Sequence, residues 1–237
     1  MSTENVMDTA QRFSTPQQAA LALAERVRDV IELAVESRGR ASLLVPGGTT
    51  PIPMFNALSK MDLPWASVYV SLTDERRVAD DSPHSNARLV RTELMQNQAA
   101  HGHFYPLHRN NTDDRADEAA GGAALGMLPR PFDAVILGMG EDGHTASLFP
   151  HDNDLARALD LKTQARCLTT TAPEPPRQRL SLTLATLLDS RWMALLLSGQ
   201  KKCQVLTQAI TSKDSQRFPV QAILDQKKVP IHVYWSP

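Results

Sequence analysis

Asp142 and His144 lie two residues apart in a segment rich in glycine, and their pairing is the clearest chemical pattern in the chain. A carboxylate next to an imidazole can fix one tautomer of the ring and tune its pKa, which suits a histidine that moves protons. The segment, residues 133–150, reads DAVILGMGEDGHTASLFP, and its three glycines let the backbone turn sharply beside a ligand. These features favour a functional histidine over one that only holds a loop in place.

A buried strand is expected to deliver this loop. The apolar run Ala134–Leu137 precedes the glycines, and open α/β sheets bind ligands at the carboxyl ends of such strands. The loop also matches GxGxxG, the fingerprint of dinucleotide-binding sites. We reject that interpretation because Pro150 comes too early for a long pyrophosphate-binding helix, and because Asp160 falls in a helix-like run instead of at the end of a second strand.

A second strand-to-helix junction carries the sequence PGGTTP at residues 46–51, directly after a strand expected at 41–45. Glycines there allow a close backbone approach, and the start of the following helix directs N–H groups and a positive dipole toward an anion. The GxxxxGK[ST] spacing of a Walker A loop is absent. The junction therefore predicts a phosphate or carboxylate site, with Thr50 as helix cap, unless it is only a tight turn. The candidate residues are Gly47, Gly48, Thr49 and Thr50.

Charged side chains follow the strand expected at 67–72, in the run TDERR at 73–77, with SN at 85–86. Because that strand ends at the same edge of the sheet as the first two, its loop can reach the same site. Two isolated cations could contribute to the same site: Arg179 at the start of a predicted strand, and Lys202 at the start of a predicted helix. A phosphate pocket needs two or three such cations from different loops, whereas each alone is typical of a solvated surface.

Histidines and cysteines elsewhere do not indicate a metal site. The run HGHFYPLH at 101–108 lacks a carboxylate or thiolate at ligand spacing, so we expect surface histidines there. Cys167 and Cys203 fit neither a metal motif nor a redox motif. We expect them to be buried or partly buried thiols of a protein in the reducing cytoplasm.

Strands alternate with helices along the chain, which predicts an α/β fold with a mostly parallel open sheet and helices on both faces. Residues 1–237 are expected to form a single domain. Thr15 can cap the first helix, Pro16 suits its first turn, and Gly39 can end it. Further helices are expected at 51–58, 87–96, 113–125 and 201–210. Strands are expected at 41–45, 67–72, 104–107, 134–137, 167–171, 179–188 (turning helical), 192–197 and 231–235.

Composition narrows the class of protein. Hydrophobic residues make up 42% of the chain, enough for a large core. The formal net charge of −1 argues against a broad surface for nucleic acid or anionic membranes. The apolar run at 192–197 is far too short to span a bilayer, and the first residues show no signal peptide. We therefore expect a cytoplasmic protein with no nucleic-acid or membrane partner.

Together these motifs resemble the 6-phosphogluconolactonase family, within the larger group that includes glucosamine-6-phosphate deaminases. The matching segments occur in the family's order and span residues 46–202. The resemblance implies a deaminase-like, modified Rossmann architecture and no metal or nucleotide cofactor. The segments are PGGTTP at 46–51, DER at 74–76 with SN at 85–86, GMGEDGHTASLFP at 138–150, QR at 178–179 and GQKK at 199–202.

The resemblance also implies a reaction, the hydrolysis of 6-phospho-D-glucono-1,5-lactone to 6-phospho-D-gluconate in the oxidative pentose phosphate pathway. His144 would then be the general base, with Asp142 orienting or polarising it. Arg76 would bind the developing oxyanion or the product carboxylate, and Asp74 would either be catalytic or order the Arg76 loop. The 6-phosphate would be held by Gly47, Gly48, Thr49, Thr50, Arg179 and Lys202, with Arg77 and Lys201 as neighbours that could share these roles.

Two alternatives stay open. The sister deaminases and isomerases use an acidic residue just before the last proline of the loop, where this chain has Phe149, which cannot transfer protons. Non-catalytic sugar-phosphate-binding domains of transcription regulators share the fold, yet they normally carry a DNA-binding helical module, for which the segment before residue 15 is too short. The sequence also leaves open whether the protein is a monomer or a small homo-oligomer.

Overall fold

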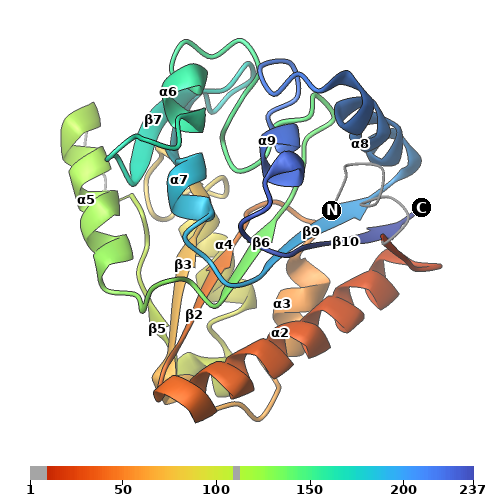
Figure 1. Ribbon diagram of the computed structural model, residues 1–237. Coiled ribbons are helices and arrows are strands. Elements are labelled where there is room, and N and C mark those ends of the chain that lie inside the picture. The colour runs from red at the N-terminus through yellow and green to blue at the C-terminus, as the bar shows by residue number, and fades with distance from the viewer. Residues whose placement is uncertain (1–9, 109–112) are drawn as a thin grey trace.

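A seven-stranded parallel sheet forms the centre of the computed structural model, which describes residues 10–108 and 113–237. Its strand order is β1–β10–β9–β6–β2–β3–β5, and every neighbouring pair is parallel (Figure 1). The predicted α/β fold is confirmed. The strands are β1 (Gln11–Arg12), β2 (Ala41–Val45), β3 (Val68–Leu72), β5 (His103–Phe104), β6 (Ala134–Leu137), β9 (Met193–Ser198) and β10 (Ile231–Ser236).

A smaller antiparallel sheet was not predicted. It has the order β4–β8–β7 and consists of β4 (Asp74–Arg76), β8 (Gln178–Leu182) and β7 (Cys167–Thr171). The expectation of a loop over residues 73–77 is therefore wrong at its centre. Three charged residues in a row lack the alternation of apolar and polar side chains that indicates a strand.

Helices cover both faces of the parallel sheet, as predicted. Figure 1 shows α2 and α3 on one side and α7 and α9 on the other. α2 packs across β2, β6, β9 and β10, whereas α5 packs on β7 and β8 of the small sheet. The helices are α2 (Pro16–Arg38), α3 (Ile52–Leu58), α4 (Asn86–Glu93), α5 (Asp114–Gly126), α6 (Leu155–Leu159), α7 (Leu184–Leu187), α8 (Gln200–Ser212) and α9 (Val220–Asp225), with 3₁₀ turns at η1 (Trp65–Ser67) and η2 (Asn97–His101).

Local sequence signals explain where the first helices begin and end. The Thr15 hydroxyl accepts the Gln18 N–H at 3.2 Å, and Gly39 ends α2 in the left-handed conformation (φ 75°), as predicted. At α3, Pro51 occupies the position before the first helical residue and no side chain caps the helix, so the predicted Thr50 cap is wrong. A Thr50 cap would need the N–H of Ile52 or Pro53, but the Ile52 N–H donates to the Thr49 carbonyl at 3.2 Å and Pro53 has none. The helix also begins one residue later than a Thr50 cap would require.

Several loops converge at one edge of the parallel sheet. β2 and β6 are buried along their whole length and, being parallel, end at the same edge as β3 and β9. The Thr73 N–H donates to the Val45 carbonyl at 3.0 Å, which joins the entry of β4 to the end of β2. The segments that follow β2, β3, β6 and β9 therefore meet at this edge.

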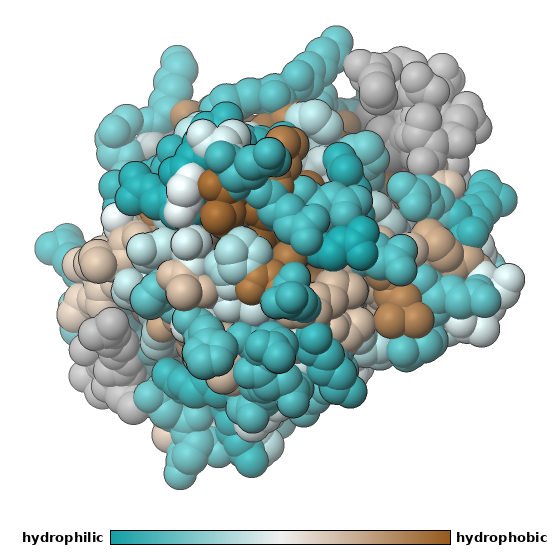
Figure 2. All heavy atoms as spheres, turned by 90° about the horizontal axis from the view of Figure 1, so that it is seen from below, coloured by the Kyte–Doolittle hydropathy of each residue, from teal (hydrophilic) through white to brown (hydrophobic). Residues whose placement is uncertain are grey.

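The outer face shown in Figure 2 is mostly hydrophilic, with apolar residues visible in small areas. Cys167 is buried and Cys203 is partly buried, and both are free thiols, as predicted. Among the described residues, no helix is long and apolar enough to cross a membrane. The large apolar side chains that are exposed are Leu21, Leu33, Met127 and Leu161.

Candidate active site

A hollow of about 340 Å³ opens at the carboxyl edge of the parallel sheet, between the loops that follow β2, β6 and β9 and the strands β4 and β8. Asp142 does not line it but is hydrogen-bonded to His144, which does. All the other predicted site residues line the hollow: Gly47, Gly48, Thr49, Thr50, Asp74, Arg76, His144, Arg179 and Lys202. The fold thus brings the separate motifs of the sequence to one place.

The imidazole of His144 is fixed by Asp142. Its Nδ1 lies 2.6 Å from Asp142 Oδ1, and the same oxygen accepts the His144 backbone N–H at 3.1 Å. Burial alone would raise the pKa of Asp142, yet the hydrogen bond and charge of His144 hold that pKa below its ordinary value. An ionised Asp142 accepts a proton-bearing Nδ1, which leaves Nε2 as the basic nitrogen of a neutral ring. The His144 side chain is 30% exposed, so this nitrogen can meet a ligand.

Gly140 shows why the loop before His144 needs glycine. A Cβ on Gly140 would lie 2.2 Å from the His144 ring and 2.5 Å from Asp142 Oδ1, so any side chain there would displace the pair. The Gly140 N–H donates to the His144 carbonyl at 2.9 Å. The ring centroids of Phe149 and His144 lie 4.5 Å apart. The imidazole is therefore held by backbone, carboxylate and aromatic contacts together.

Asp74 and Arg76 reach the hollow from the same side of β4, because alternate residues of a strand face the same way. Asp74 is 7% exposed, and its Oδ2 accepts the Ser147 hydroxyl at 2.6 Å. Arg76 donates from Nη1 to Asn86 Oδ1 at 2.6 Å and to the His84 carbonyl at 3.0 Å, while its Nε is buried without a partner among the described residues. The Arg76 guanidinium therefore retains donors for a ligand.

Three cations gather in the hollow. Arg76 and Arg179 form a register pair across β4 and β8. Burial, followed by the charge of Arg76, lowers the pKa of Arg179, and burial lowers that of Lys202 against the opposing charge of Glu141. Within residues 10–108 and 113–237, neither Arg179 nor Lys202 has a carboxylate ion-pair partner. A bound phosphate would offset their repulsion, so the arrangement suits an anion.

Arg77 and Lys201 do not share these positions. Arg77 donates from Nε to Asp117 Oδ2 at 2.6 Å, on the side of β4 away from the hollow. Lys201 forms an ion pair with Glu141, and its side chain is 68% exposed. Neither residue lines the hollow, so the structure separates each from its neighbour in sequence.

Among the lining residues that were not predicted as site residues, three contact predicted ones through their side chains: Asn86, Ser147 and Phe149. Asn86 and Ser147 hydrogen-bond to Arg76 and Asp74, and the guanidinium of Arg179 lies 5.7 Å from the Phe149 ring centroid. All three belong to the matching motifs, at 85–86 and 138–150. Motif membership could have identified them, but spacing alone does not tell which side chain of a motif points into a pocket.

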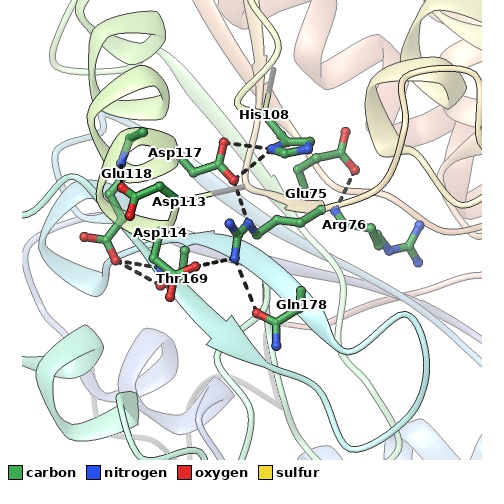
Figure 3. A network of polar contacts seen from close by, with 11 residues as sticks. Glu75, Arg76, His108, Asp113, Asp114, Asp117, Glu118, Thr169 and Gln178 are labelled. Carbon is green, nitrogen blue, oxygen red and sulfur yellow. Dashed lines mark hydrogen bonds and ion pairs between the residues drawn. The ribbon is translucent and has the colours of Figure 1, made fainter. Parts of the chain in front are cut away.

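His108 is not the surface residue that was expected. It is 5% exposed, and its Nδ1 lies 2.8 Å from Asp117 Oδ1 (Figure 3). The other two histidines of the 101–108 run are exposed, as predicted. Only the fold brings α5 back over this run, so the sequence around His108 could not indicate its burial. No group of three or more possible metal ligands occurs in the part of the chain that the structure describes.

Known proteins resemble this chain over nearly its whole length. A family model described as "Glucosamine-6-phosphate isomerases/6-phosphogluconolactonase" matches residues 14–235. A 6-phosphogluconolactonase of Mesorhizobium japonicum is 43% identical, over 95% of this chain and 94% of the relative. The crystal structure of a 6-phosphogluconolactonase from Shewanella baltica is 40% identical with a TM-score of 0.93, over 98% of this chain and 99% of that one.

A more distant structure bears on the architecture. A monomeric glucosamine-6-phosphate deaminase is 20% identical with a TM-score of 0.73, over 95% of this chain and 96% of that one. At this identity the likeness shows the fold alone. It confirms the deaminase-like architecture that the motifs implied.

Proposed function

Because the chain belongs to the family of glucosamine-6-phosphate isomerases and 6-phosphogluconolactonases, we propose that it hydrolyses 6-phospho-D-glucono-1,5-lactone to 6-phospho-D-gluconate. The observation that carries the proposal is the Asp142–His144 pair in a hollow that also holds three cations. A basic imidazole beside an anion site suits the hydrolysis of a phosphorylated lactone. The reaction would be a step of the oxidative pentose phosphate pathway in the cytoplasm.

His144 acts as the general base in this proposal. Its Nε2 takes a proton from a water molecule, whose oxygen forms a bond to the lactone carbonyl carbon. The bond between that carbon and the ring oxygen then breaks, and the imidazolium returns the proton to the ring oxygen, which becomes a hydroxyl. Asp142 orients the ring and stabilises the imidazolium while it carries the proton.

The remaining side chains bind and orient the substrate. Arg76 stabilises the oxyanion of the tetrahedral intermediate with its unused donors. Asp74, already engaged by Ser147, orders this wall of the hollow and does not react. Binding of the 6-phosphate places the carbonyl carbon against the water. The phosphate ligands are Arg179, Lys202, the N–H groups of Gly47 and Gly48, and the hydroxyls of Thr49 and Thr50.

Phe149 favours lactonase chemistry over the isomerase or deaminase alternative. Its ring lines the hollow next to His144, at the position where an acidic side chain is needed for ring opening and proton transfer. A phenyl ring neither donates nor accepts a proton, so the hollow lacks a group for that step at this position. We therefore expect no release of ammonia from glucosamine 6-phosphate.

The test is a coupled assay of lactone hydrolysis. The lactone is generated in place from glucose 6-phosphate, and the product is read as NADPH formed by added 6-phosphogluconate dehydrogenase, with the spontaneous rate subtracted. We expect acceleration proportional to enzyme, and we expect His144→Ala to lower kcat by ~10²–10⁴ while the protein stays folded. An unchanged kcat in that variant would contradict the role of His144. Binding of sugar phosphates without turnover would support a binding-only domain instead.

A further inference from the structure

Strand β4 has two faces with different partners. Asp74 and Arg76 face the hollow, whereas Glu75 and Arg77 face away from it. Arg77 donates from Nε to Asp117 Oδ2 at 2.6 Å, and Asp117 also contacts His108 (Figure 3). Glu75 instead turns toward the first residues of α4. The proposed mechanism gives no task to this buried carboxylate.

The carboxylate of Glu75 is 2% exposed and surrounded by hydrogen-bond donors. Its Oε1 accepts the backbone N–H of Asn86 at 2.7 Å and that of Arg76 at 2.6 Å. Its Oε2 accepts the N–H of Ala87 at 2.7 Å and the Ser85 hydroxyl at 3.4 Å. One side chain therefore joins the backbone of β4 to the beginning of α4, at two residues that line the hollow.

Asn86 links Glu75 to the Arg76 guanidinium in the hollow. Its Oδ1 accepts from Arg76 Nη1 at 2.6 Å, and its Nδ2 donates to the Asp74 carbonyl at 2.9 Å. A Cβ added to Gly47 would lie 1.9 Å from the same Oδ1, so the loop after β2 presses directly against Asn86. Asn86 is 1% exposed and close-packed, which leaves its side chain little freedom to rotate. The His84 carbonyl accepts from the same Nη1 at 3.0 Å, so Asn86 and His84 together set the place of the guanidinium, and Glu75 sets the place of Asn86.

We propose that Glu75 is a positioning residue that, by fixing Asn86, holds the Arg76 guanidinium where negative charge develops on the substrate. This rests on the proposed function, because Arg76 receives its role there. Glu75 and Arg76 then act as one unit, although Glu75 does not line the hollow. A side chain that only stabilised the fold would act independently of Arg76.

A double-mutant cycle of Glu75→Gln and Arg76→Ala tests this coupling. Glutamine keeps the size of the side chain, but its amide nitrogen cannot accept the hydrogen bonds that one carboxylate oxygen accepts now. In the wild-type background we expect Glu75→Gln to lower kcat/KM for the lactone by ~10-fold or more. In the Arg76→Ala background we expect a change of less than about two-fold. Equal losses in both backgrounds overturn the proposal.

Glu118→Gln is the matched control, because Glu118 lies on α5 and its carboxylate accepts hydrogen bonds from the same small sheet. Glu118 Oε1 accepts the backbone N–H and the hydroxyl of Thr169 at 3.0 Å and 3.1 Å (Figure 3). It does not line the hollow, and β7, which it contacts, is separated from β4 by β8. We expect kcat/KM of this variant to stay within about two-fold of wild type, because its contacts do not reach Arg76. A loss as large as that of Glu75→Gln would show a general effect and overturn the proposal.

A crystal structure of Glu75→Gln separates this inference from the proposed function. We expect Asn86 and the Arg76 guanidinium to be displaced, whatever activity the wild type shows. An intact contact between Arg76 and Asn86 overturns the positioning role. A displaced guanidinium in a protein without lactonase activity counts against the proposed function alone. If Glu75→Gln does not fold, Glu75→Asp replaces it in the cycle and in the structure.

Discussion

The two walls of the hollow are built in opposite ways. On one side, the side chains of His144 and Asp142 lie on a loop that leaves the parallel sheet, and they are 30% and 36% exposed. On the other side, Asp74 belongs to a strand of the antiparallel sheet and is 7% exposed, with Glu75 behind it at 2%. The loop holds its pair by close approach of the backbone, whereas the strand holds its side chains by buried polar contacts on its other face.

This difference fits the tasks that the proposed function gives to the two walls. A proton acceptor must meet water and substrate, so an exposed loop serves it. Charges that stabilise a transition state act best when they are fixed in advance, which favours a strand anchored from behind. We therefore expect substitutions behind the antiparallel sheet to lower stability first, and substitutions in the loop to lower kcat first.

The largest expected effect is that of Asp117→Asn behind the small sheet. Asp117 is fully buried, and its carboxylate pairs with Arg77 at 2.6 Å and contacts His108 at 2.8 Å. Removing its charge leaves the 8% exposed Arg77 with only the exposed Asp114 as a carboxylate partner among the described ion pairs. We expect the free energy of unfolding, measured by urea titration, to fall by about 3–5 kcal/mol.

Asp29→Asn is the matched control for that substitution. Asp29 also pairs with an arginine, Arg28, but the two side chains are 46% and 40% exposed. We expect this change to leave the free energy of unfolding close to that of wild type, because exposed ion pairs contribute little. Equal costs for the two substitutions would mean that the contacts behind β4 do not anchor the strand.

A pH dependence of stability comes next in size. Burial raises the pKa of Glu75 to about 7, against the lowering effect of the backbone N–H groups. The folded state therefore binds this proton more tightly than the unfolded state, for which the ordinary value is 4.5. The resulting stability is fully present below about pH 4.5 and is lost as the pH rises through 7. Between these limits, the free energy of unfolding of wild type should fall by about 3 kcal/mol more than that of Glu75→Gln. Parallel pH profiles of the two proteins would contradict this.

The same contrast explains how well each wall could be predicted from the sequence. The signals for the loop are local: the apolar strand, the glycines and the Asp142–His144 pair all lie within residues 133–150. The sequence therefore predicted the strand, the loop and the Asp142–His144 pair together. The sequence left open whether Asp142 contacts His144 directly, and the 2.6 Å contact depends on the turn that Gly140 allows.

The antiparallel wall depends on contacts between distant parts of the chain. Arg76 pairs with Arg179 across two strands, and Arg77 meets Asp117 on a helix that follows much later. A run of charged residues is usually solvated, so composition pointed away from burial at Glu75. Nothing near these residues in sequence indicates their partners. The charged run with Arg76 and the isolated Arg179 were noted as cations that could reach the site, and the motif resemblance gave them roles, whereas the buried carboxylate behind them had no comparable signal.

In the loop, Asp142→Asn should affect rate and leave stability nearly unchanged. An amide can donate to Nδ1, which places the ring proton on Nε2 and removes the base. We expect kcat to fall by about 10² with a small change in KM. The assay is the lactone coupling described above, and an unfolding midpoint close to wild type is the control. An unchanged kcat would show that Asp142 does not select the tautomer of His144.

The smallest effect is expected for Lys201→Ala, and its neighbour provides the contrast. Lys201 is 68% exposed in its ion pair with Glu141, whereas Lys202 lines the hollow and has its pKa lowered by burial. We expect Lys201→Ala to change kcat/KM by less than about two-fold. Lys202→Ala should raise KM by ~10-fold or more with little change in kcat, because it removes a charged contact to the phosphate in ground and transition state alike. A pure loss of kcat in Lys202→Ala would instead place this lysine next to the reacting carbonyl.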